Sequence, residues 1–130
     1  MAVRVVRLGS PRAQGEGTRI GTVRRPPRGV PKAEFASQNW YDVWFPTLAP
    51  SAETMKLGQA AVTDAEWKAF ERRYRAEMAQ PEAAHALQLL ATMSHGAAFS
   101  VGCYCEHEAR CHRSLLRGLL VERGALMAND

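Results

Sequence analysis

The segment of residues 97–104 most constrains the fold of this chain, because both of its faces are apolar or small. Phe99, Val101 and Cys103 would point to one side of a strand, and small residues alternate with them. Such a strand is typical of the centre of a sheet that helices cover on both sides. A polar loop and a helix expected at 111–123 follow it. We therefore expect an α/β fold, a small single-domain sheet, mostly parallel or mixed, flanked by helices.

Local patterns predict the remaining elements. Strands are expected at 3–8 and 18–24, and helices at 52–57, 64–79 and 81–96. Ser51 is suited to cap the first of these helices, and Thr63 opens the second with a capping box. Pro81 fits the first turn of the third. The tail at 125–130 is expected to fray.

Length and composition narrow the class of protein. At 130 residues we expect one domain, 1–130. No apolar run approaches the roughly 20 residues that span a bilayer, and the amino terminus lacks a signal-peptide core. We therefore expect a cytoplasmic protein with reduced thiols and no membrane partner. Three cysteines are an odd number, which argues against a disulfide framework.

Charge is unevenly distributed along the chain. The net charge is +4, yet residues 1–32 hold eight basic side chains and one acid, Glu16. Three prolines make 25–32 a stiff extended loop that carries Arg25, Arg28 and Lys32. This basic quarter predicts a phosphate-bearing partner, either a nucleotide or nucleic acid, although a solvated surface gives the same pattern.

A candidate anion site lies where the polar loop after the central strand meets the last helix. Helix amino ends carry partial positive charge, so cations are disfavoured there unless an anion sits among them. Arg110, His112 and Arg113 crowd this end, and Glu106 and Glu108 could instead neutralise it internally. We select as ligand-binding candidates the following residues: Arg24, Arg28, Glu106, Arg110 and Arg113.

Nucleophilic chemistry is a second possibility at the same place. A thiol near a helix amino end and arginines has a depressed pKa, so Cys105, Cys111 and His112 are candidate catalytic residues, with Glu106 as a further acid or base. The spacing argues against a phosphatase loop, because Cys111 stands at the position after Cys105 where that loop needs an arginine.

The cysteines and His112 also offer the ligand atoms of a zinc site. Cys103, Cys105, Cys111 and His112 supply three sulfurs and one nitrogen, a set that tetrahedral zinc accepts. Their spacing departs from the usual knuckle, in which two residues separate paired ligands. We therefore expect no metal and no cofactor.

An aromatic-rich stretch allows two interpretations. Residues 39–46 hold four aromatic side chains within six positions. They would suit a nucleobase platform, but large aromatic side chains dominate core burial, and we favour the core.

Several motifs together resemble the domain-of-unknown-function family 488 (DUF488), and in layout its YeaO-like branch. They are the segment 24–30, the stretch from Trp44 to Ser51, the run 67–74, and Cys103-Tyr104-Cys105-Glu106 followed by Cys111-His112-Arg113-Ser114. The last resembles the cysteine-histidine-arginine signature of the wider family, from which the branch usually differs. Arg25-Pro26 also replaces the usual leucine and tryptophan. The resemblance implies a compact α/β domain with a shared pocket, and no substrate.

These observations lead to two hypotheses about function. In the first, the chain binds a phosphate-bearing small molecule or other anion, such as a nucleotide, between the segments 105–113 and 24–28; whether it is an enzyme stays open. In the second, it is a nucleic-acid or protein interaction module that uses the basic amino-terminal face.

Overall fold

The architecture was obtained as a computed structural model, which describes residues 1–105 and 111–128. Within that part the strands are β1 (Ala2–Arg7), β2 (Thr18–Gly21), β3 (Val43–Trp44) and β4 (Ala98–Cys103). The helices are α1 (Ala52–Ala60), α2 (Asp64–Met78), α3 (Pro81–Met93) and α4 (His112–Glu122), with short 3-10 turns η1 (Lys32–Glu34) and η2 (Pro46–Leu48). The predicted α/β class is confirmed.

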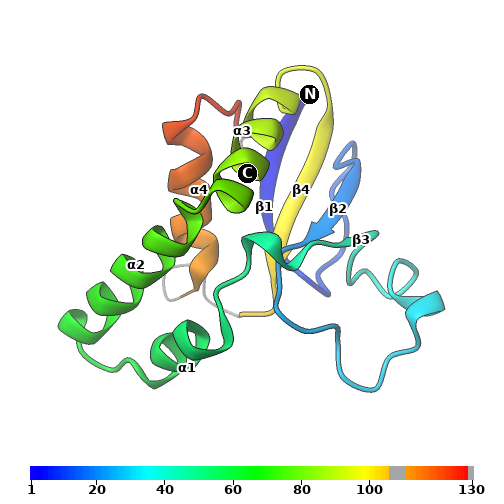
Figure 1. Ribbon diagram of the computed structural model, residues 1–130. Helices are drawn as coiled ribbons and strands as arrows, with labels where there is room; N and C mark the ends of the chain where they lie inside the picture. Colours follow the sequence, from blue (N-terminus) through cyan, green and yellow to red (C-terminus); the bar gives the residue numbers. More distant parts are fainter. Residues whose placement is uncertain (106–110, 129–130) are drawn as a thin grey trace.

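The four strands form one parallel sheet in the order β1-β4-β2-β3 (Figure 1). β4 lies between β1 and β2, so Val101 is the register partner of both Val5 and Ile20. The central strand that sequence indicated is therefore confirmed. The carboxyl ends of β1, β4 and β2 meet at one edge, which is the edge where open α/β sheets place ligands.

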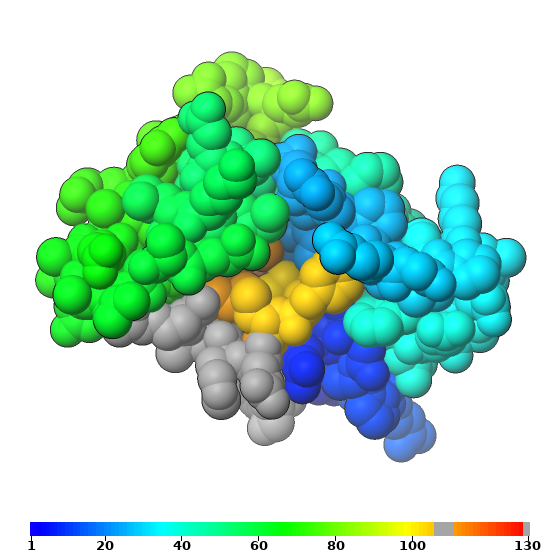
Figure 2. All heavy atoms as spheres, turned by 90° about the horizontal axis from the view of Figure 1, so that it is seen from below, coloured from blue at the N-terminus to red at the C-terminus, as the bar shows by residue number. Residues whose placement is uncertain are grey.

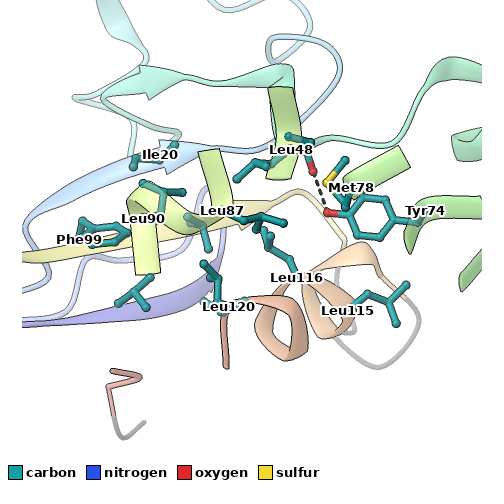
Figure 3. Packing of buried hydrophobic residues seen from close by; sticks show 14 of the residues in the cluster. Ile20, Leu48, Tyr74, Met78, Leu87, Leu90, Phe99, Leu115, Leu116 and Leu120 are labelled. Atoms are coloured by element: carbon teal, nitrogen blue, oxygen red, sulfur yellow. Dashed lines mark hydrogen bonds between the residues drawn. The ribbon is translucent and has the colours of Figure 1, made fainter. Parts of the chain in front are cut away.

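One face of the sheet carries the main apolar core. Val3, Val5 and Val101 from the strands pack in one cluster with side chains of all four helices. Figure 3 shows this packing and the hydrogen bond from the buried Tyr74 hydroxyl to the Leu48 carbonyl, 2.8 Å, which ties α2 to η2. Helices on both faces were expected, and this was wrong, because every helix packs into the cluster on this one face.

The opposite face is covered by the segment that joins β1 to β2. Its Glu16 carboxylate accepts hydrogen bonds from Arg19 Nε at 2.8 Å and Ser100 Oγ at 2.6 Å, and all three residues are buried. The small residues on this side of β4 therefore leave room for a close-fitting polar layer. In the sequence alone, the same alternation of apolar and small residues is equally compatible with a covering helix.

Helix starts follow the local signals closely, whereas α1 ends three residues later, and α3 three residues earlier, than the expected 57 and 96. Ser51 caps α1 by accepting from the Thr54 N–H, and Thr63 and Glu66 form the complete capping box of α2. Pro81 occupies the first turn of α3. These predictions are confirmed, because a cap satisfies backbone groups within its own few residues and needs no distant partner.

The carboxyl-terminal segment is more ordered than expected. The Val3 N–H donates to the Leu126 carbonyl at 2.9 Å, and the Ala128 N–H donates to the Val3 carbonyl at 2.8 Å. Fraying was therefore the wrong expectation for residues 125–128, and residues 129–130 lie outside the described part of the chain. The described residues contain no helix that is long and apolar enough to span a bilayer.

Candidate functional site

A cavity of about 970 Å³ opens at the carboxyl ends of the parallel strands. It is lined by residues that follow β1, β2 and β4, together with parts of α1, α2 and the start of α4. Figure 2 looks onto this end, where the chain up to residue 105, yellow to orange, lies between the green helices and the blue segment after β2. The volume is at the upper end of the range for small-molecule sites.

Arginines supply the charge of this cavity. Its lining includes Arg7, Arg24, Arg25 and Arg28, whereas none of the described lining residues carries a carboxylate. Arg7, Arg25 and Arg28 are exposed to solvent. The described wall therefore has a positive electrostatic potential, which favours an anionic ligand.

The proline-rich loop that carries these arginines is anchored at two points. Arg24 donates from Nε to the Pro50 carbonyl at 3.1 Å and from its terminal nitrogen to the Ala49 carbonyl at 3.2 Å. The Tyr104 hydroxyl donates to the Arg25 carbonyl at 2.9 Å. Arg24 thus holds the loop in place, while Arg28 extends from a backbone that prolines keep stiff. Such stiffness lowers the entropy that the loop loses on binding.

Aromatic rings form two walls of the cavity. Trp67 stacks on Phe70 with ring centroids 4.7 Å apart, and Trp40 meets Tyr104 edge to face at 5.8 Å. Both tryptophans are only half-buried, so part of each ring faces the open space. Flat rings beside arginines are surfaces on which a nucleobase stacks.

The aromatic-rich stretch divides between core and surface. Tyr41 is buried, as the core interpretation predicted, and Trp40 and Phe45 are half-buried. Trp44 is 45% exposed, and its indole N–H donates to the Val23 carbonyl at 2.8 Å. The stretch is therefore not a single platform, and Trp40 alone of its members lines the cavity among the described residues.

Cys103, Cys111 and His112 form the buried floor of the cavity. The sulfur atoms of Cys103 and Cys111 are brought into contact, which connects the end of β4 to the start of α4. The odd cysteine number argued against a disulfide framework and gave no sign that these two sulfur atoms would meet. Cys105 is the cysteine left outside the pair, and it is exposed.

Hydrogen bonding fixes the His112 ring. Its Nε2 lies 2.8 Å from the Thr22 carbonyl, and its Nδ1 lies 3.8 Å from Cys111 Sγ. Burial lowers the pKa of His112 to about 4, and the nearby Arg113 acts in the same direction against the bond to Thr22. The imidazole is therefore neutral at neutral pH.

The Cys105 thiol does not have the electrostatics of an activated nucleophile. Cys105 is exposed as a residue, yet the atoms that crowd its sulfur remove water from it and raise the pKa of the thiol, and the opposing effect of Arg113 is smaller. The thiol is therefore protonated at neutral pH. Its place at the cavity wall is retained, but the depressed pKa that the sequence suggested is not found.

The remaining predicted site residues lie in different places. Arg24 and Arg28 line the cavity with Cys105, Cys111 and His112, so the two predicted segments do meet. Arg113 is buried, donates to the Cys105 carbonyl at 2.6 Å, and is not among the described lining residues. Glu106 and Arg110 lie outside the described residues.

Arg7 and Trp67 were missed as lining residues. Arg7 ends β1, and the edge formed by neighbouring strand ends would have suggested it once β1 was placed beside β4. Trp67 was assigned to a buried helical stripe with Phe70, Tyr74 and Met78, of which it is the half-buried first member. A residue at the end of a buried helical stripe lies at the border of the core, so its side chain can face a cavity as well as the core.

Comparison with known proteins identifies a family and one relative. Residues 3–124 match the family profile described as the active DUF488-N3 subclade. An 82-residue region is 34% identical to the uncharacterized protein YeaO of Escherichia coli (strain K12), and covers 63% of this chain. The same region spans 66% of YeaO, just under two thirds of its length. No solved structure matches the chain.

Proposed function

Because the chain belongs to the DUF488 family, in which a shared pocket is expected, we propose that its cavity binds a phosphate-bearing small molecule of the nucleotide type. The observation that carries this proposal is the composition of the wall. Four arginines line the cavity, and no carboxylate of the described lining residues opposes them. An unbalanced positive wall becomes favourable when the ligand supplies the negative charge.

Arg28 and Arg25 are assigned to the phosphate. Both are exposed at the cavity, and both stand on a loop fixed by Arg24 and Tyr104. A guanidinium binds phosphate oxygens through two parallel N–H donors, which gives direction as well as charge. Arg7 reaches the same cavity from the end of β1 and adds to the potential.

Trp40 and Trp67 are assigned to the base. Each presents part of its ring to the cavity, on walls formed by different elements. Stacking of a base on an aromatic ring contributes roughly 1–3 kcal/mol. A ligand with a ring at one end and phosphate at the other therefore matches the wall better than either inorganic phosphate or a nucleoside does.

The proposal includes a role for the chain beyond binding. The matching subclade is described as active, and we take this to mean that the pocket acts on its ligand. His112 is neutral and buried at the floor, where the Thr22 carbonyl fixes the orientation of its ring toward the cavity. We place the protein in the cytoplasm, where nucleotides and reduced thiols are both present.

Calorimetry with three classes of ligand tests the proposal. We expect nucleoside mono- and triphosphates to bind, while the same nucleosides and inorganic phosphate bind much more weakly. Arg28→Gln should weaken nucleotide binding about tenfold, or ~1.4 kcal/mol, since it removes a charged hydrogen bond. Arg72→Gln is the matched control, because Arg72 is exposed on α2 and does not line the cavity.

Equal weakening by Arg28→Gln and Arg72→Gln would contradict the proposal, because it would show a nonspecific effect of net charge. Nucleosides that bind as tightly as nucleotides would also contradict the proposal.

The alternative, a nucleic-acid module, predicts that the chain binds DNA or RNA of any sequence and that this binding is lost between low and high salt. Part of the basic quarter is already committed within the chain, since Arg19 is buried against Glu16 and Arg12 pairs with Asp42. We therefore favour the small-molecule ligand.

A further inference from the structure

Three ligand atoms converge at the floor of the cavity. Cys103 Sγ, Cys111 Sγ and a ring nitrogen of His112 all lie within 4.8 Å of one another, and all three residues are buried. They come from the end of β4 and the start of α4, two elements that share the main core. The fold therefore holds the three donors together, although the sequence places Cys103 well before the other two.

The His112 ring has the orientation of a metal ligand. The Thr22 carbonyl, 2.8 Å from Nε2, can only accept, so Nε2 carries the proton and Nδ1 keeps its lone pair. Nδ1 is the nitrogen on the side of Cys111 Sγ, at 3.8 Å. Metal-bound histidines usually donate their other ring N–H to a carbonyl or carboxylate in this way.

Thr22 is itself held in position by the strand beside it. Its N–H and its hydroxyl both donate to the Gly102 carbonyl, at 3.0 and 2.9 Å, and its side chain is fully buried. The carbonyl that orients His112 is therefore fixed by β4, the strand that also carries Cys103. Such support of a ligand's orientation is characteristic of metal sites.

The separation of the two cysteines favours an ion over a disulfide. Their Cα atoms are 7.9 Å apart, whereas most disulfides span about 4.4–6.8 Å. A tetrahedral zinc ion with Zn–S bonds of about 2.3 Å holds its two sulfurs ~3.8 Å apart, so it accommodates a wider backbone separation. The two side chains would turn slightly apart to admit the ion between them.

We propose that Cys103, Cys111 and His112 bind one zinc ion at the floor of the cavity, with the fourth position open toward the ligand space. Two thiolates and a neutral imidazole balance the charge of Zn²⁺. Three protein ligands with one open position is the arrangement of reactive zinc sites. There the ion takes an anionic oxygen and polarises the bond beside it. The ion would add a positive centre to the arginine-lined wall.

Metal content of the full chain tests this inference. The protein is purified under reducing conditions from cells grown with added zinc, dialysed against metal-free buffer, and analysed by elemental mass spectrometry. We expect about one zinc per chain. Cys111→Ser and Cys103→Ser should each lower the zinc content at least tenfold, while Cys105→Ser, the matched control, retains it. Circular dichroism identifies any variant that fails to fold.

Cobalt and thiol titrations on the wild-type chain decide the case if the cysteine variants do not fold. Cobalt(II) added to the metal-free protein should give thiolate-to-cobalt charge transfer and tetrahedral ligand-field absorption. After unfolding without reductant, three thiols should titrate. A single titratable thiol would show that Cys103 and Cys111 form a disulfide, and would overturn the inference. A wild-type zinc content below about 0.1 per chain without the cobalt bands would also overturn it.

These measurements are independent of the nucleotide proposal. A chain that binds zinc but no nucleotide would refute the proposed ligand and leave the metal site standing. A chain that binds nucleotide through Arg28 without zinc would refute the metal site alone.

Discussion

Two groups of arginines from the same basic stretch end in opposite surroundings. Arg19 is fully buried, and its guanidinium donates to both Glu16 carboxylate oxygens and to the carbonyls of Ser10 and Asn39. Arg25 and Arg28 are exposed at the cavity, and no described carboxylate pairs with them. One cation holds the sheet and its covering segment together, and the others remain available to a ligand.

The two groups differ in how much water their guanidinium groups lose when the chain folds. A charge as deeply buried as that of Arg19 is tolerated only when paired and fully hydrogen-bonded, and its neighbours supply those contacts. An exposed arginine keeps its water and needs no partner within the chain. A basic stretch in a sequence therefore does not by itself indicate a binding surface. The arginines that pair with carboxylates inside the fold must first be set aside, because only the remaining ones can bind a ligand.

Glu16→Gln should produce the largest effect. It leaves the buried Arg19 without its counter-ion and should lower the free energy of unfolding by about 3–5 kcal/mol. Urea unfolding followed by circular dichroism measures this loss. Adding Arg19→Met to the same chain should recover part of it, because the uncompensated charge is then gone. A loss below about 1 kcal/mol would place the pair among surface interactions and remove the contrast between the two groups.

Acid should weaken the same pair with a defined sign. Burial raises the pKa of Glu16, but hydrogen bonds from Arg19, Ser100 and the Ala13 N–H outweigh it and hold the pKa at about 2, below its ordinary value of 4.5. A depressed carboxyl pKa stabilises the fold above about pH 4.5, and this contribution is lost as the pH falls toward 2. At roughly 1.4 kcal/mol per pKa unit, the loss is about 3 kcal/mol.

The pH dependence of unfolding by urea checks this expectation. Asp42 and Glu77 also have lowered pKa values, because hydrogen bonds from Arg19 and Ser51 outweigh the opposite effect of burial. The comparison is therefore between the wild type and Glu16→Gln, whose stability should fall less steeply below pH 4.5. Identical slopes would mean that Glu16 is not the group that titrates.

Arg12→Gln probes a case between the two groups. Arg12 forms a two-pronged pair with Asp42, with N–O distances of 2.8 and 3.1 Å, but both side chains are about one third exposed. Pairs of this kind contribute about 0.2–1 kcal/mol, and salt screens them. Thermal unfolding at low and high salt should show a small loss that shrinks as salt is added. A loss as large as that of Glu16→Gln would mean that burial does not explain the contrast.

The position of the candidate site followed from the sequence, but its composition did not. The strand at 97–104 and the polar loop after it predicted a site at the strand ends, since that rule depends only on a central parallel strand. Arg19 and Arg28, by contrast, look equivalent in the sequence. What separates them is the packing of Glu16 beneath Ser100, a contact between segments far apart in the chain.

The cysteines and Arg113 show the same limit. Spacing along the chain argued against a metal set, yet the parallel fold brings Cys103 beside Cys111 and turns His112 toward them. Arg113 was the leading anion contact because of its place at the helix amino end, but the first turn directs it to the Cys105 carbonyl. Helix periodicity predicts on which face of a helix a residue lies. The contacts of that residue depend on the segments that pack against this face, and periodicity does not predict those.

The smallest effect on stability should come from Arg25→Gln combined with Arg28→Gln. Neither guanidinium has a described partner, so the free energy of unfolding should change by less than about 0.5 kcal/mol. Nucleotide affinity measured on the same sample should nevertheless fall at least tenfold, because the phosphate loses its charged donors. The hydrogen bond from the Tyr104 hydroxyl to the Arg25 carbonyl does not depend on either arginine side chain, so the loop should keep its place.

A large loss of stability in this double variant would show that the fold, and not a ligand, uses the two arginines. Unchanged stability with undiminished nucleotide binding would remove them from the site. An intact fold with lost nucleotide binding is the result that separates Arg25 and Arg28 from Arg19, because removing Arg19 should lower the stability of the fold.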